Sequence, residues 1–424
     1  MKRNNLIPSA LAFFALTAGA VQAAPVKINF WEQSPPETGA EIDKWIAVFQ
    51  KSNPNIQVIR QHYENEELRT KFLRSSVTGD GADIVSGPND IAGVFATAGV
   101  IQPVDGMFKA DMFNSKSLDM TRIDGKTWGL PLNEGNHLIL YYNKDLVKNP
   151  PATTKDLIDQ AKAFTNEKQN KYGLAFFQSE PFWFVSFLHG FGGSPLQVNG
   201  KDVKVTIDTP EMQKALQFLV DLKDKEKILP KECNVDCAKS LFLSGNALFH
   251  ISGDWELSTY AEKLGDKLGI APLPVITETG KPMAPMLGGL FLYVNASTKG
   301  KELDATRKFL QYLSSKQVQQ RVATKLNKIP ATIEARADAS VKNNAILNAS
   351  AQAAANARPM PPQVEMRAAW DGMRIMVQRA LSGKETVAQA VKTGQRAADE
   401  ALKGIQQTPG KKPDTSAAMP AKAG

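Results

Sequence analysis

Aromatic rings lie close to acidic or basic side chains at three separate places in this sequence. These places hold Glu180 with Phe182 and Trp183, Asp254 with Trp255, and Trp370 with Asp371 and Arg374. A flat ring packs against the C–H face of a sugar, while carboxylates and guanidinium groups bind hydroxyl groups through charge-assisted hydrogen bonds. The pattern favours binding of a polyhydroxylated ligand. A single Trp of this kind is more often buried packing, so the prediction depends on the recurrence.

The first of these places opens a ring-rich segment, SEPFWFVSFLHGFGG, at residues 179 to 193. Pro181 suits the first turn of a helix, and the glycines near the end of the segment suit its exit. Rings that recur at helical spacing after this start are expected to be core. They are Phe184, Phe187 and Phe191. Phe182 and Trp183 lie in the first turn beside Glu180, where a helix start faces solvent or a cleft.

Signatures of common catalytic and metal sites are absent from the sequence. The GGS at 192 to 194 lacks the second glycine of a nucleophile elbow, and four His occur without a pair at metal-ligand spacing. We expect neither a metal nor a cofactor. Acid and base catalysis by two carboxylates stays open, because any two acids in a cleft would serve. Cys233 and Cys237, in CNVDC, are expected to form a small loop disulfide in an oxidising compartment.

The two ends of the chain differ in composition from the rest. Lys2 and Arg3 precede an apolar run and a small-residue stretch ending at Ala23, which is the pattern of an export signal over residues 1 to 23. No Cys lies near that cleavage point, so we expect a periplasmic protein without a lipid anchor. Residues 408 to 424 have no periodic apolar face and are expected to be a disordered tail.

Length and charge limit the class of protein. The roughly 400 residues that would remain after removal of the export signal exceed what one hydrophobic core usually organises, so two domains or two lobes are expected. The formal net charge is +8, without a basic block interleaved with aromatic residues. This distribution argues against a nucleic acid as partner.

The N-terminal part alternates strand and helix patterns. A strand pattern at 26 to 33 is followed by a helix pattern after the Pro-Pro turn, in which Ile42, Trp45, Ile46 and Phe49 share one face. A second strand, a second helix and a third strand come next. This order predicts an α/β fold with a mainly parallel sheet flanked by helices.

Ligands of such sheets bind beyond the carboxyl ends of the strands. The loops 32 to 37, 62 to 67 and 86 to 90 should therefore meet at one rim. Polar residues in these loops, Glu32, Gln33 and Glu64, are candidate ligand contacts. Further along, we expect a helix over 211 to 228, strands at 246 to 253 and 288 to 295, and helices from Glu302 to about Gln406.

Five longer motifs resemble those of periplasmic maltose/maltodextrin-binding proteins, the solute receptors of carbohydrate ABC importers. They are VTGDGADIV (77 to 85), YYNKDLVKNPP (141 to 151), FFQSEPFWF (176 to 184), GNALFHISGDW (245 to 255) and RPMPPQVEMRAAWDGMR (358 to 374). The resemblance runs over residues 26 to 405. It implies a two-lobed periplasmic-binding-protein fold with the ligand between the lobes.

The resemblance also implies a set of sugar-contacting residues. On the second lobe they are Glu180, Phe182, Trp183, Trp255, Trp370 and Arg374, and on the first lobe Asp90 and either Glu134 or Asn136. Asp254 is a further candidate contact from the pattern of rings beside charges alone. Three roles are open for Gly288 and Gly289: they could allow the backbone to approach the sugar, absorb a hinge rotation, or simply be turn residues. The sequence departs from the maltose pattern on the first lobe, at Gly87, Ile91, Arg69 and Thr70. These departures suggest a shorter or differently linked glucoside, trehalose or sucrose included.

We therefore expect a monomeric receptor for maltose, maltodextrin or a related glucoside that closes around the sugar and delivers it to permease subunits in the inner membrane. One lobe should comprise residues 24 to 135 with 290 to 340, and the other 136 to 289 with 341 to 407. Two alternatives stay open. One is an exported glycosidase that uses Glu180 or Asp90, and the other is the same fold with a non-sugar solute such as a polyamine or a metal complex.

Overall fold

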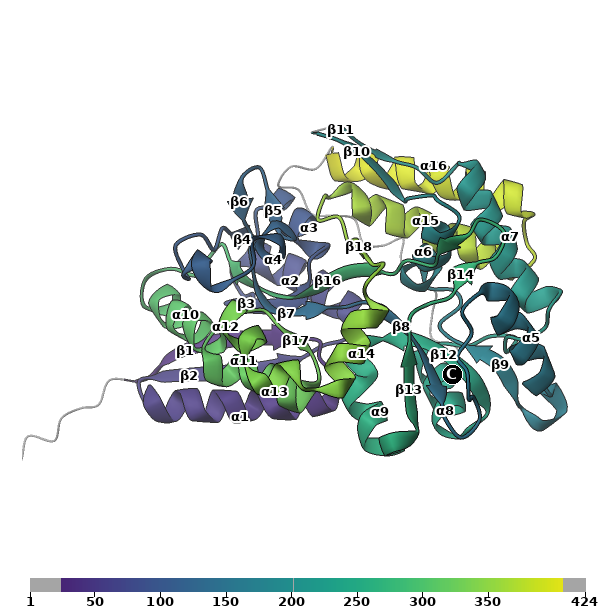
Figure 1. Cartoon of the computed structure of the whole chain (residues 1–424). Helices are drawn as coiled ribbons and strands as arrows, with labels where there is room; N and C mark the ends of the chain where they lie inside the picture. Colours follow the sequence, from purple (N-terminus) through teal and green to yellow (C-terminus); the bar gives the residue numbers. More distant parts are fainter. Residues whose placement is uncertain (1–23, 201, 407–424) are drawn as a thin grey trace, which may run out of the picture.

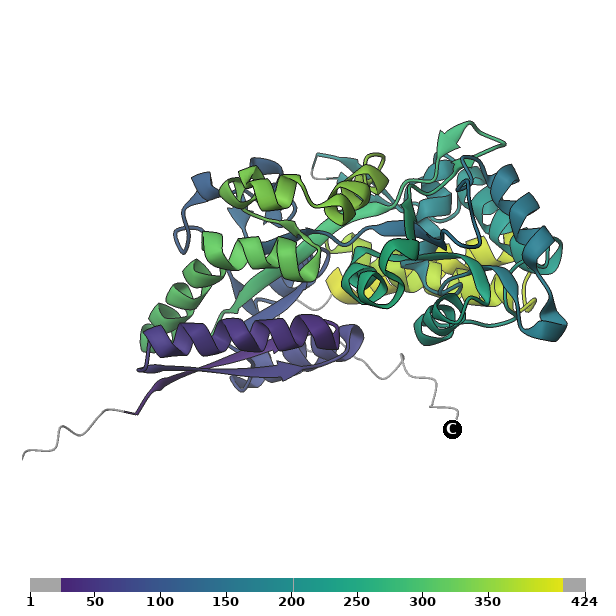
Figure 2. The same ribbon diagram turned by 60° about the horizontal axis from the view of Figure 1, so that its bottom comes forward.

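The computed structural model of the chain describes residues 24–200 and 202–406. Two bodies lie beside one another in both views, with α1 (Pro36–Ser52) in one and α16 (Val387–Gln406) in the other (Figures 1 and 2). The expected export signal and the expected tail lie outside the described residues. Within these described ranges, no helix has the length and apolar character that crossing a membrane requires.

The first body is built on an eight-stranded sheet within the described ranges, with the order β17-β7-β16-β3-β1-β2, while β4 and β18 also pair with β16. Its strands are β1 (Val26–Glu32), β2 (Ile56–His62), β3 (Ile84–Pro88), β4 (Ile101–Gln102), β7 (Gly129–Gly135), β16 (Met286–Asn295), β17 (Ile329–Pro330) and β18 (Arg358–Pro359). A small hairpin of β5 (Arg122–Ile123) and β6 (Lys126–Thr127) stands apart from this sheet.

The two-lobed α/β architecture is as expected, but the sheets are mixed rather than mainly parallel. In the first body β1 is parallel to β2 and β3, whereas β16 is antiparallel to both β3 and β7. The direction of β16 has a simple cause, because this strand returns to the sheet from the second body. β7 leaves the first body and β16 comes back beside it, so the two strands run in opposite directions, whereas the short β18 is parallel to β16.

Helices cover both faces of this sheet. They are α1, α2 (Asn65–Thr78), α3 (Ile91–Thr97), α4 (Ser115–Asp119), α10 (Gly300–Leu313), α11 (Lys316–Leu326), α12 (Ile333–Ala337) and α13 (Ala339–Lys342), with the 3-10 turn η1 (Ala110–Met112). The predicted apolar face of α1 is buried at Ile42, Trp45, Ile46 and Phe49 and packs against Phe309 of α10. On the other face Trp31, Phe72 and Phe95 form a second core.

The second body has a four-stranded sheet with the order β13-β8-β12-β9, in which β8 is antiparallel to both of its neighbours. Its strands are β8 (Leu138–Asn143), β9 (Tyr172–Ala175), β12 (Ala247–Gly253) and β13 (Leu268–Ala271), with the hairpins β10 (Leu196–Asn199) to β11 (Asp202–Val205) and β14 (Val275–Ile276) to β15 (Lys281–Pro282). Its helices are α5 (Thr154–Phe164), α6 (Pro181–Gly190), α7 (Pro210–Asp224), α8 (Val235–Leu243), α9 (Leu257–Leu264), α14 (Ala345–Ala353), α15 (Glu365–Leu381) and α16, with the 3-10 turns η2 (Glu167–Gln169), η3 (Asp254–Glu256) and η4 (Gly265–Lys267).

Helix α6 behaves as its sequence predicts. Pro181 stands at its first turn, and Phe184, Phe187 and Phe191 are buried in the largest core of the second body. Helix α7 begins and ends earlier than the predicted range and stops at Asp224, and Lys227 then has a φ of +55°. That left-handed residue reverses the chain, and the segment after it returns to the sheet beside β9, where Leu174 donates to the carbonyl of Ile228.

Two buried histidines make the stability of the second body sensitive to acid. Burial lowers the pKa of His250 to about 4 and that of His189 to about 4, although each ring nitrogen Nδ1 donates to a backbone carbonyl. Unfolded His has a pKa near 6.5, so between pH 6.5 and 4 the unfolded chain binds protons that the folded chain does not. The free energy of unfolding should fall over that window by on the order of 3 kcal/mol for each His.

Urea denaturation at pH 7, 5.5 and 4 measures this loss. His250→Gln should flatten the pH dependence, because it removes one of the two buried imidazoles. An equal slope in His250→Gln and in the parent protein would assign the acid sensitivity to other groups.

Candidate functional site

Four rings singled out in the sequence lie together in the second body. Phe182 and Trp183 come from the first turn of α6, Trp255 from η3 and Trp370 from α15. The ring centroid of Phe182 is 5.9 Å from that of Trp183, 6.1 Å from that of Trp255 and 6.2 Å from that of Trp370. We call these four side chains the ring cluster. Phe182 and Trp255 are half-buried, so the cluster keeps part of its flat apolar surface accessible.

Contacts with β12 hold two of these rings in place. The indole Nε1 of Trp183 donates to the carbonyl of Ile251 in β12 at 2.8 Å, and Trp183 is 7% exposed. The ring of Trp255 lies flat over Gly253, where an added Cβ would come within 2.0 Å of the indole. Trp183 therefore supports the cluster, and Gly253 provides the space that Trp255 occupies.

Charged side chains border the ring cluster. Nη2 of Arg374 lies 3.1 and 3.2 Å from the two carboxylate oxygens of Glu180. Asp371 lies 2.8 Å from Arg367 and 3.8 Å from Arg374, both on its own helix. Each carboxylate is held in place by a guanidinium group, which leaves ordered acceptors and donors beside the rings.

Asp90, at the N-terminal cap of α3 in the first body, reaches the ring cluster directly. Nε1 of Trp370 donates to its Oδ2 at 3.0 Å. Among residues 24–200 and 202–406, no hydrogen-bond partner reaches the buried Oδ1 of Asp90. Burial raises the pKa of this carboxyl, and Arg69 together with the hydrogen bond from Trp370 opposes that shift. Asp90 thus combines an unused acceptor with a bond that joins the two bodies.

A second pair of contacts crosses between the bodies nearby. Nδ2 of the buried Asn89 donates to the carbonyl of Met360 at 2.7 Å. Gly288 lies against Asn89, because a Cβ at this position would come within 2.2 Å of Oδ1 of Asn89. Gly289 lies equally close to the carbonyl oxygen of Asn133 in β7. Both glycines therefore serve close packing where β16 enters the first body.

An ionic cluster extends this contact. Arg69 of α2 is 7% exposed, and burial, followed by the nearby Arg367, lowers its pKa to about 9. Glu66 pairs with Arg69 of its own helix and lies 3.5 Å from Arg367 of α15. Sequence reasoning noted Arg69 only as a departure and missed Glu66 and Arg367. The spacing of Arg367, Asp371 and Arg374 along one face of a helix could have predicted that these side chains form a charged cluster.

Glu134 and Asp254 lie where the chain crosses between the bodies. Glu134 accepts from the hydroxyl of Ser117 and pairs with Arg336, and Asn136 adopts a φ of +51° just beyond it. The carboxylate of Asp254 fills the space beside Gly135 and lies 3.9 Å from Nδ1 of His137. Burial lowers the pKa of Lys328, and Asp254, Glu256 and Glu32 oppose this shift.

The three loop residues predicted from strand ends are in different surroundings. Glu32 is completely buried, and its oxygens accept from Arg60 at 2.6 Å and from the backbone amide of Ser34 at 2.6 Å, with His62 at 3.2 Å. Glu64 is 89% exposed. Within the described ranges no hydrogen-bond partner reaches the buried Oε1 of Gln33. Of the three, Gln33 has a free acceptor, and Glu32 already has its partners within the first body.

Glu32→Gln should lower stability without changing ligand affinity. Removing the carboxylate leaves Arg60 without one of its two acidic partners in a partly buried network, which should cost about 2–3 kcal/mol in the free energy of unfolding. Urea denaturation measures this loss, and a titration with the ligand at 20 °C provides the control. A weakened affinity at unchanged stability would instead make Glu32 a ligand contact.

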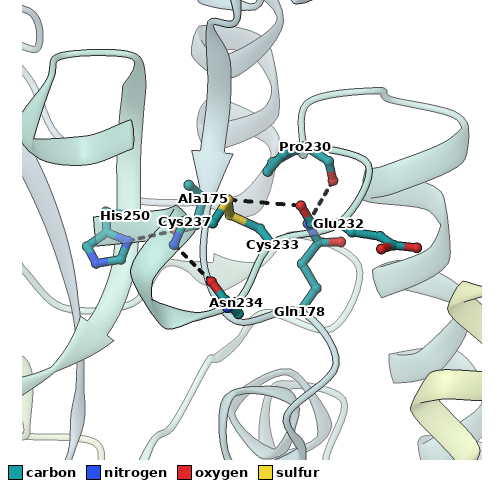
Figure 3. Close-up of a disulfide and its surroundings, with 8 residues drawn as sticks. All are labelled: Ala175, Gln178, Pro230, Glu232, Cys233, Asn234, Cys237 and His250. Carbon is teal, nitrogen blue, oxygen red and sulfur yellow. Dashed lines mark hydrogen bonds between the residues drawn. A yellow bond between two sulfur atoms is a disulfide. The ribbon is translucent and has the colours of Figure 1, made fainter. Parts of the chain in front are cut away.

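Cys233 and Cys237 form a disulfide at the start of α8, with sulfur atoms 2.00 Å apart (Figure 3). Asn234 within this loop caps the helix, since its Oδ1 accepts from the amide of Cys237 at 2.9 Å. In the described part of the chain no group of three or more His, Cys, Asp or Glu has the arrangement of a metal site.

A two-lobed α/β fold with rings on one lobe and an acceptor reaching them from the other defines the class of solute-binding proteins. The chain belongs to the family described as bacterial extracellular solute-binding protein, whose model matches residues 44–349. The resemblance seen in the five motifs is confirmed at the level of this family.

Named relatives agree with this assignment. A maltotriose-binding protein of Pyrococcus abyssi is 25% identical over 357 residues, 82% of this chain and 76% of that protein. The maltodextrin-binding protein MdxE of Bacillus subtilis is 29% identical over 349 residues, 80% of this chain and 81% of that protein. The maltose/maltodextrin-binding domain MalE from Bdellovibrio bacteriovorus, solved bound to maltotriose, has a TM-score of 0.85 and 34% identity, covering 89% of this chain and 100% of that chain. All three are binding proteins, which supports a receptor over an exported glycosidase.

Proposed function

We propose that this protein binds a maltodextrin-type oligosaccharide between its two bodies and delivers it to an ABC importer. One observation carries the proposal: Trp370 is part of the ring cluster and also donates to Asp90 of the opposite body. A ligand beside Trp370 would touch both bodies, and a ligand that touches both favours the form in which they are close. The named relatives support the choice of sugar.

The proposed contacts divide by chemistry. Phe182 and Trp255 offer most of the flat surface to the C–H faces of glucose units, and the more deeply buried Trp370 adds a smaller part. Oδ1 of Asp90, the Glu180–Arg374 pair and Oε1 of Gln33 offer partners to hydroxyl groups. We assign Trp183, Glu134 and Gly288 to support of the site, since Trp183 and Glu134 already have polar partners and Gly288 packs against Asn89. Asp254 is assigned to support as well, because its buried carboxylate packs against Gly135. Glu32 and Glu64 are left out of the contact set.

Location and architecture complete the proposal. Residues 1 to 23 direct export, and the mature protein works as a monomer in the periplasm without a lipid anchor. Residues 24 to 135 with 290 to 340 form one lobe and residues 136 to 289 with 341 to 407 the other. Closure of the lobes around the sugar is the state that permease subunits in the inner membrane recognise.

Isothermal titration with maltose, maltotriose, maltotetraose, trehalose, sucrose and glucose tests the function. Saturable binding of the α-1,4-linked series supports it, and a preference for trehalose or sucrose would change the sugar but keep the receptor. Chromatography of the same mixtures after prolonged incubation gives the second readout. Sustained release of shorter sugars would replace the receptor with a glycosidase.

A further inference from the structure

We propose that Gln178 is a positioning residue for the turn that leads into α6 and thereby places Glu180 and Phe182. We also propose that the Cys233–Cys237 disulfide restrains the carbonyl group of Pro230, which accepts from Gln178. This inference deepens the proposed function and rests on it, since the turn matters only if its side chains contact a sugar. Gln178 itself does not touch the ring cluster in our assignment; it acts through the turn.

The turn between β9 and α6 has one buried polar side chain. Gln178 is 4% exposed, and its Nε2 donates to the carbonyl of Pro230 at 2.7 Å. Figure 3 shows this bond beside the disulfide, with the two segments facing one another. The backbone amide of Glu180 donates to the carbonyl of Phe177, which closes the turn around Gln178. A buried amide group without its partner would be costly, so the bond ties this turn to the segment that holds Pro230.

The acceptor belongs to a segment that the disulfide restrains. Pro230 lies three residues before Cys233, which is bonded to Cys237 in the first turn of α8. Asn234 caps the same turn, and Cys233 packs with Leu241 and Phe242 in the core that covers β8 and β9. Sγ of Cys237 also lies 3.9 Å from the carbonyl oxygen of Glu232, a contact without a hydrogen, since disulfide sulfur carries none. Opening the disulfide would remove one of the restraints on the chain on the C-terminal side of Pro230.

The other end of the turn is held separately. Trp183 donates to Ile251 of β12, and its ring lies 5.7 Å from that of Phe177. Glu180 and Phe182 lie between this anchor and the Gln178 anchor. Their partners Arg374 and Trp370 belong to α15, a different element. Losing the Gln178 anchor lets the turn move relative to α15, and the ligand then has to order it at a cost in affinity.

The test compares Gln178→Leu with Gln217→Leu in otherwise unchanged mature protein. Gln217 is an exposed residue of α7 in the same body, and its Nε2 donates to Asp221 at 2.7 Å. This control therefore loses a hydrogen bond of the same kind and length, but on the surface and away from the turn before α6. Maltotriose affinity is measured by titration at 20 °C, and thermal unfolding is recorded for each protein. We expect Gln178→Leu to bind about tenfold more weakly and Gln217→Leu to bind as the parent does.

A double-mutant cycle distinguishes positioning from general destabilisation. The double variant Cys233→Ala with Cys237→Ala should weaken binding several-fold alone and add little to Gln178→Leu, because both act through the carbonyl of Pro230. Independent, additive losses would overturn the inference, as would parent-like affinity in Gln178→Leu. Should Gln178→Leu fail to fold, reduction of the parent protein with a phosphine tests the same contact, and unchanged affinity would overturn it. A parent protein that binds none of the six sugars overturns the proposed function together with this inference.

Discussion

Replacing Trp370 with alanine is expected to weaken maltotriose binding by about 100-fold. The change removes ring surface beside Phe182 and also the Nε1 donor to Asp90, so both the apolar face and the bond between the bodies are lost. Trp370 is 6% exposed, and truncating it leaves a cavity that should cost about 3 kcal/mol of stability. Titration therefore has to be carried out well below the unfolding temperature, with circular dichroism to verify the fold.

Trp370→Phe is the matched control for this substitution. It keeps an aromatic face but has no donor for Asp90, so we expect affinity between those of the parent and the alanine variant. Parent-like binding by Trp370→Ala in folded protein would remove this residue from the site. Parent-like binding by Trp370→Phe would show that the ring, and not the bond to Asp90, supplies its contribution.

Asp90→Ala is expected to have the second largest effect, a loss of affinity of about 30- to 100-fold. The substitution removes the free acceptor Oδ1 and leaves Trp370 without its acceptor. It also leaves the buried Arg69 with less compensating negative charge, which should make closure of the two bodies less favourable. Calorimetric titration with maltotriose measures the affinity, and the enthalpy should become less favourable as hydrogen bonds are lost.

Asp304→Ala controls for the change in net charge, because Asp304 is an exposed acid on α10 of the same body. Its affinity should equal that of the parent protein. If Asp90→Ala and Asp304→Ala bind equally well, the acceptor that we assign to the first body must be another residue.

Periodicity and local signals predicted much of the fold. The apolar face of α1 and the buried rings of α6 were readable because side chains three and four apart share a helix face. Recurrence of rings beside charges identified Phe182, Trp255 and Trp370 correctly as neighbours. Strand direction was not readable in the same way, because whether β16 runs parallel or antiparallel to β3 depends on the path between the bodies.

Pairings across long sequence separations set the limits of the prediction. Glu32 looked like a free polar residue at a strand end, but the register of β1 with β2 puts it opposite His62 and near Arg60. Trp183 looked equivalent to Phe182, yet Ile251, 68 residues away, takes its indole hydrogen. The ionic cluster of Glu66, Arg69 and Arg367 joins positions 301 residues apart. Such partners are decided by tertiary structure, which no local pattern encodes.

The adjoining strands β7 and β16 have a mechanical consequence. At the crossing, Gly288 pairs with Gly135 and Gly289 with Glu134, so two paired strands form one ribbon that runs from one body to the other. A paired ribbon flexes easily out of its own plane and resists bending within it. The two bodies should therefore rotate about this strand pair as a hinge. A transporter that contacts both bodies would release the sugar by moving them apart, without unfolding either one.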